Sequence, residues 1–152
     1  MGGTLVSALL TSFFATLGFG VLLHAPSRAL LLTAVAGMVA NGCYWAFGAA
    51  GLSDHAAIFL AAVVASVLAE FLARRMKMAA TVFITLSIIP LVPGLSLYRA
   101  MAFLAQGESK AGLELGVSAM ITFLMIALGI GMGSFLIRLR KGSGAPPPPV
   151  AR

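Results

Sequence analysis

The chain has 152 residues, of which 61% are hydrophobic and 9% are charged, whereas a soluble domain carries about 25% charged residues. This composition excludes a water-soluble globular protein and predicts an integral membrane protein. The formal net charge of +6 does not indicate nucleic-acid binding, because the basic residues stand in short clusters at the ends of apolar runs. The single cysteine, Cys43, excludes a disulfide framework within the chain.

Apolar runs long enough to cross a bilayer, about 20 residues each, follow one another along the chain. The expected spans are Thr4–Leu23, Ala29–Gly51, Ala56–Ala73, a fourth that begins near Ala79, and Leu113–Ile137. The fourth span meets Pro90 and Pro93 partway along and ends before a polar patch, Gln106–Lys110. Residues 1–141 are therefore expected to form a transmembrane helical domain, and residues 142–152 a Pro-rich, disordered cytoplasmic tail.

The basic residues predict the orientation of these helices. One side of a five-helix arrangement holds most of them: Arg28, Arg74, Arg75, Lys77, Arg138, Arg140, Lys141 and Arg152. The other side holds only Arg99 and Lys110. Because basic loops stay in the cytoplasm, we expect the N-terminus outside and the C-terminus inside. The predicted fold is an all-α integral membrane protein with about five helices, the fourth broken at a P-x-x-P-G segment.

That segment lies within Ser87–Met101, which reads SIIPLVPGLSLYRAM. Proline costs about 3 kcal/mol or more inside a helix. Pro90 falls about 16 Å along the fourth helix, near the middle of a hydrocarbon core about 30 Å thick. Broken backbone at this depth must be buried in protein or line a wet cavity, and in transporters it forms the substrate site. The alternative is a simple proline kink that neighbouring helices repair.

If the break forms part of a transport path, two further details are expected. The carbonyls of Leu86 and Ile89 lose their usual helical donors to Pro90 and Pro93. Ser96 is a candidate cap for a new half-helix, whose N–H groups favour a carboxylate.

Other polar residues allow both functional and structural interpretations. Asn41 lies near mid-membrane and is a candidate for substrate binding or for interhelical hydrogen bonding. Arg99 suits a substrate carboxylate or an anchor at the outer interface. Tyr98 belongs to an expected aromatic belt, and His55 is expected at the interface. Glu70 is spaced for an i,i+4 ion pair with Arg74.

Small and polar residues also recur along the helices. Serines and threonines expected at similar depth form a candidate polar layer: Thr11, Ser12, Ser66, Ser87 and Thr122. Gly129 and Gly133 form a G-x-x-x-G pattern, and Gly112 and Gly116 repeat its spacing. Such patterns allow helices to approach closely. They predict packing within the chain or contact with a partner subunit.

Two stretches carry a family resemblance. The segment IIPLVPGLSLYRAM resembles the P-x-x-P-G segment of the threonine/serine exporter (ThrE) family, in particular its small, YjjB-like component of two-component members. The segment GFGVLLHAPSRAL, Gly18–Leu30, resembles the first helix and loop of that component. The motif positions carried over are Pro90, Pro93, Gly94, Tyr98 and Met101.

The resemblance implies a subunit of a secondary exporter of small carboxylates, either threonine and serine or dicarboxylates such as succinate. It implies a larger membrane partner of the same family, a bacterial cytoplasmic (inner) membrane location, and an oligomer as a further expectation. The candidate path residues are Pro90, Pro93, Gly94, Ser96, Tyr98, Asn41 and Arg99. No catalytic residues, metal or cofactor are expected. The alternative function is a non-transporting structural or assembly subunit.

Overall fold

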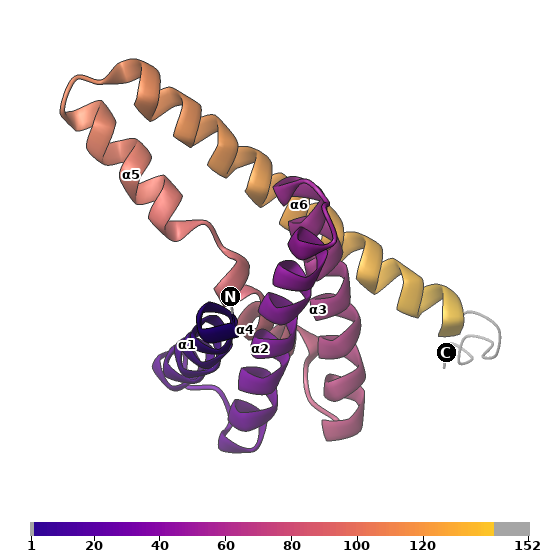
Figure 1. Cartoon of the computed structure of the whole chain (residues 1–152). Coiled ribbons are helices and arrows are strands. Elements are labelled where there is room, and N and C mark those ends of the chain that lie inside the picture. The colour runs from indigo at the N-terminus through magenta and orange to yellow at the C-terminus, as the bar shows by residue number, and fades with distance from the viewer. Residues whose placement is uncertain (1, 142–152) are drawn as a thin grey trace, which may run out of the picture.

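The computed structural model describes residues 2–141, which form helices joined by short connections (Figure 1). The elements are α1 (Gly2–Leu22), α2 (Ser27–Ala49), α3 (Asp54–Met76), α4 (Ala80–Ile88), the 3₁₀ helix η1 (Ile89–Leu91), α5 (Gly94–Ala105) and α6 (Ser109–Lys141). The all-α prediction is confirmed. The expected tail, residues 142–152, lies outside the described residues.

Four of these helices, α1, α2, α3 and α6, are long and apolar enough to cross a membrane. The fourth predicted span is a pair of shorter helices, Ala80–Leu91 and Gly94–Ala105, bent by 55° at the break. Counted as one span, this pair brings the total to five, as predicted. The break also falls where the prolines place it. The orientation with the N-terminus outside stays a prediction.

The last helix begins earlier than expected. The apolar run predicts a start at Leu113, but α6 begins at Ser109. Gly107 has φ +83, a left-handed conformation that glycine adopts without steric cost. It turns the chain directly after α5. The polar residues that follow therefore belong to the first turn of α6.

Small side chains form the contact surfaces of the helical body. The buried face of α3 is a row of alanines with Ser66: Ala57, Ala61, Ala62, Ala65, Ala69 and Ala73. Such a face lets neighbouring helices approach closely. The short helix α4 packs against α2 and α3, and its side chains Phe83, Leu86 and Ser87 are almost fully buried. The first half of the broken span is thus embedded in the body.

The second half of the broken span packs elsewhere. Among the described residues, the extensive contacts of α5 are with α6. At about 1.5 Å per residue, the 33 residues of α6 extend for about 50 Å. Its first half lies beside α5 and its second half crosses α3, so that α5 and the start of α6 form a hairpin that stands away from the other helices (Figure 1).

The glycine patterns pack within the chain. A Cβ placed on Gly129 would lie 2.7 Å from the Ala62 Cβ, and one on Gly133 would lie 2.7 Å from the Ser66 Cβ, both on α3. Gly112 is similarly close to Leu104 of α5, at 2.7 Å from its Cγ. The remaining pattern member, Gly116, lies against Ala100 at 3.9 Å. These contacts correspond to the packing alternative of the sequence analysis.

Candidate functional site

The backbone at the break is tighter than the sequence suggests. Pro90 has no N–H for the Leu86 carbonyl, but the N–H of Ile89 donates to that carbonyl instead. The N–H of Val92 donates to the Ile89 carbonyl at 3.3 Å. Both carbonyls expected to lose their donors are therefore bonded through 3₁₀-type turns. The expectation of freed carbonyls at this position is wrong.

The N–H groups on the other side of the break are different. Helix α5 begins at Gly94 with Pro93 as its N-cap, and no side chain caps it. Ser96 is the third helical residue, so its predicted capping role is wrong. The first bond of the helix is from the Leu97 N–H to the Pro93 carbonyl, at 3.1 Å. Among the described residues, the N–H groups of Leu95 and Ser96 have no partner.

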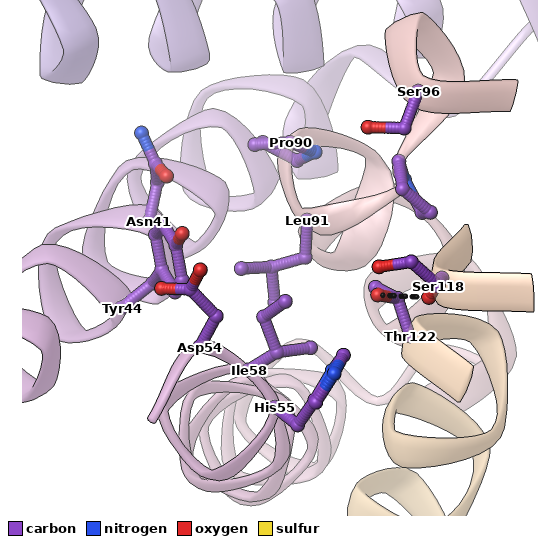
Figure 2. Close-up of a pocket in the computed structure, with 11 residues that line it drawn as sticks. Asn41, Tyr44, Asp54, His55, Ile58, Pro90, Leu91, Ser96, Ser118 and Thr122 are labelled. Atoms are coloured by element: carbon purple, nitrogen blue, oxygen red, sulfur yellow. Dashed lines mark hydrogen bonds between the residues drawn. The ribbon is translucent and has the colours of Figure 1, made fainter. Parts of the chain in front are cut away.

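This helix start borders a cavity of about 310 Å³ (Figure 2). We call it the outer cavity, because Asp54 and His55 of its lining follow the end of α2 that the predicted topology places outside. It is lined by α2 (Asn41, Tyr44), the start of α3 (Asp54, His55, Ile58), the break (Pro90, Leu91, Pro93), α5 (Ser96) and α6 (Ser118, Thr122). The fold thus assembles four of the predicted path residues, Asn41, Pro90, Pro93 and Ser96, around one space.

Three predicted path residues do not line the cavity. Gly94 lies beside the lining residue Pro93 but does not contribute to the wall. Tyr98 is 70% exposed, as an aromatic residue of a membrane interface would be. Arg99 is exposed on α5. Of the predicted path residues on α5, Ser96 therefore lines the cavity and the other three do not.

Asn41 takes part in both packing and cavity lining. Its side-chain amide donates to the Ser12 hydroxyl at 2.7 Å and to the Ala8 carbonyl at 3.4 Å, which ties α2 to α1. The predicted polar layer is otherwise largely bonded within its own helices, as with the Ser87 hydroxyl, which donates to the Phe83 carbonyl at 2.7 Å. Interhelical hydrogen bonding by Asn41 is confirmed. Substrate binding by Asn41 stays a prediction.

The sequence analysis missed several lining residues. Asp54, and His55 that was expected only at the interface, form the first turn of α3 and line the cavity. The Nδ1 atom of His55 is shielded from solvent and has no hydrogen-bond partner among the described residues. Ser118 on α6 is another missed lining residue. It lies one turn before Thr122 of the predicted polar layer, whose hydroxyl donates to the Ser118 carbonyl at 3.0 Å (Figure 2).

Helix directions give the cavity a distinct electrostatic character. The N-termini of α3 and α5 both border it, and each carries a partial positive charge that favours anions. One wall holds the exposed carboxylate of Asp54. Neither lysine nor arginine is among the lining residues. The wall therefore combines the partial positive charge at the start of α5 with the carboxylate of Asp54.

Comparison with known proteins places this geometry in a family. The family model described as "Threonine/Serine exporter, ThrE" matches residues 8–136. A "Probable threonine/serine exporter" of Mycobacterium tuberculosis is 32% identical over 123 residues, which are 80% of this chain and 23% of that relative. The chain thus spans less than a quarter of the relative's length. No solved structure matches. Because the family model covers most of the chain, the protein belongs to the threonine/serine exporter (ThrE) family.

Proposed function

We propose that the chain is a membrane subunit of an exporter of small amino acids, and that the outer cavity is part of its transport path. The observation that carries this proposal is the convergence of the helix break with Asn41, Asp54 and the α6 hydroxyls on one space. The volume of about 310 Å³ is at the small end of ligand pockets, about 300–1,000 Å³. It suits a metabolite of a few heavy atoms.

The charges of the wall favour an amino acid over a dicarboxylate. The α-carboxylate would accept hydrogen bonds from the unpartnered N–H groups of Leu95 and Ser96, with support from the dipole of α5. The ammonium group would pair with Asp54. A dicarboxylate such as succinate would bring its second carboxylate toward Asp54, in a wall that has no lysine or arginine to compensate. Threonine and serine are therefore the proposed substrates.

The proposal includes a larger membrane partner of the same family, as the sequence resemblance implies. It also includes location in the bacterial cytoplasmic membrane and secondary transport driven by the proton gradient. The competing function is a structural or assembly subunit whose presence supports a partner's transport. In that case export would require the chain but not the residues of its cavity.

Asp54→Asn separates these functions. A hydrogen bond to a charged group contributes about 1.5–3 kcal/mol, and each 1.4 kcal/mol is tenfold. We expect threonine efflux at low internal concentration to fall by about tenfold to a hundredfold. The matched control is Glu114→Gln, which neutralises an exposed carboxylate on α6 that does not line the cavity. We expect this control to export normally.

The assay uses cells that lack their own exporters and are preloaded with labelled threonine or succinate. The chain is expressed alone and with a larger family partner, and membrane levels of each variant are compared by immunoblot. Normal efflux from Asp54→Asn would contradict the assignment of the ammonium site. Succinate efflux at the rate of threonine would contradict the substrate class.

The break is tested separately. Replacing Pro90, Pro93 and Gly94 together by alanine would continue the helix through the cavity wall and remove the start of α5. We expect threonine efflux to be lost while the variant still inserts into the membrane. Unchanged efflux would mean that the break is a simple kink with no part in transport.

A further inference from the structure

A second cavity, of about 270 Å³, lies at the other end of the helical body. We call it the inner cavity. It is lined by the α1–α2 connection (Leu23, His24, Ala25, Pro26) and by one face of α4 (Thr81, Val82, Thr85, Leu86). The α1–α2 connection precedes α2, whereas Asp54 and His55 of the outer cavity follow it, so these lining segments lie at opposite ends of this 23-residue helix (Figure 1).

One turn of helix separates the two cavities. Leu86 lines the inner cavity and Pro90 lines the outer one. Four residues along a helix correspond to about 6 Å. Within this turn Ser87 is fully buried and Ile88 is 8% exposed. The linings of the two cavities are therefore about one helical turn apart along the chain.

The packing around Leu86 is close and apolar. A Cβ placed on Gly20 of α1 would lie 2.6 Å from the Leu30 Cδ2 of α2 and 3.6 Å from the Leu86 Cδ1. A larger residue at this point would require the end of the Leu30 side chain to shift. Thr81 and Thr85 line the inner cavity from successive turns of α4. The inner cavity thus borders an apolar contact made by three helices.

We propose that the inner cavity is the second access site of the same transport path and takes the same class of small zwitterionic solute. The turn Leu86–Pro90 is the seal between the two sites. This inference rests on the proposed function. In the predicted topology the inner cavity faces the cytoplasm, so solute for export enters there. Because α4 packs against α2 and α3 while α5 packs against α6, the 55° break lets the seal move independently of α5.

Thiol labelling tests the two access sites in the full chain, with its larger partner where assembly requires one. In a Cys43→Ala background, single cysteines replace Thr85 in the inner cavity and Ser118 in the outer cavity. Leu31→Cys is the matched control, because Leu31 is 61% exposed near the same end of α2 and lines neither cavity. A membrane-impermeant maleimide reacts only with a hydrated thiolate.

We expect the cysteine at Thr85 to react from one side of the membrane only, the cysteine at Ser118 from the opposite side only, and the Leu31 control from neither side. Saturating threonine should slow both reactions. Reaction of the first two from the same side, or no reaction at Thr85, would overturn the inference. If the Leu31 control were labelled as fast as the cysteine at Thr85, the labelling at Thr85 would reflect ordinary interfacial water. That result would also overturn the inference.

The protection pattern distinguishes this inference from the function on which it rests. If threonine protects the cysteine at Ser118 but not the one at Thr85, the inner cavity is off the path and the proposed function stands. If threonine protects neither, the proposed function fails as well. Both results are read from the same labelled membranes.

The seal has its own test. Leu86→Ala shortens the closing side chain, and we expect labelled threonine to equilibrate across proteoliposomes without a proton gradient. Leu128→Ala is the control, since Leu128 is 53% exposed on α6 and lines neither cavity. We expect proteoliposomes with that control to retain the threonine gradient. A Leu86→Ala variant as tight as the control would overturn the assignment of the seal.

Discussion

Gly133 lies at the closest approach of α6 to α3, and adding one methyl group there should weaken the fold. The new Cβ would lie 2.7 Å from the Ser66 Cβ and 2.9 Å from the Val63 carbonyl oxygen. The Val63 oxygen is backbone and the Ser66 Cβ is bound directly to backbone, so no flexible side chain can rotate away. The two helices must separate.

The cost has two parts. Overpacking a tight contact costs about 1–3 kcal/mol. Separation also weakens the bonds of the Ser66 hydroxyl to the Ile130 carbonyl at 3.2 Å and to the Ser134 hydroxyl at 3.3 Å, each worth about 0.6 kcal/mol in a membrane. The gain in helix propensity on replacing glycine by alanine is about 1 kcal/mol. We expect Gly133→Ala to lower the free energy of unfolding by about 1–3 kcal/mol.

Gly131→Ala is the matched control on the same helix. A Cβ there would have no neighbour within 4 Å, so only the propensity gain remains. Reversible unfolding in mixed micelles with increasing denaturing detergent, followed by circular dichroism, measures the free energy of unfolding of both variants. Equal stability of Gly131→Ala and Gly133→Ala would refute the close-contact argument and imply that α6 is not fixed on α3 as described.

Two further substitutions test contacts described above. Asn41→Leu removes the bonds to Ser12 and the α1 backbone, and we expect a loss of about 0.6–1.7 kcal/mol of unfolding free energy together with slower threonine efflux; a change in stability alone would remove Asn41 from the path. Glu70→Gln breaks the ion pair with Arg74, whose N–O distance is 3.4 Å with Arg74 half exposed. We expect the free energy of unfolding to fall by less than about 0.5 kcal/mol and efflux to stay normal. A loss of efflux would show that Glu70 acts in transport.

The sequence predicts the number of helices and the place of the break well, because both follow from local properties. Apolar length identifies a span, and proline removes a helical donor wherever it stands. The i,i+4 pair Glu70–Arg74 is local in the same sense, and it is observed. The repair of the Leu86 and Ile89 carbonyls by 3₁₀ turns was not predictable in this way, since it depends on how far the backbone tightens after losing a donor.

The cavity wall was only half predictable. Pro90, Pro93 and Ser96 are adjacent in sequence, so one motif finds them. Asp54 and His55 belong to another helix, and no periodicity tells which connection of a bundle faces the break. The glycine pattern on α6 predicted a close helix contact, but its counterpart is the alanine face of α3, which carries no comparable motif. Tertiary pairing decided each of these, and it is the information that a single sequence lacks.

The division of the broken span also bears on how the protein is made. Its two halves, Ala80–Leu91 and Gly94–Ala105, contain 12 residues each, and a length of about 20 is needed to cross a bilayer. The first half finds its neighbours, α2 and α3, among segments already synthesised, whereas the second half leans on α6, which emerges later. The extensive packing of α5 therefore waits for the last helix, which is synthesised after it.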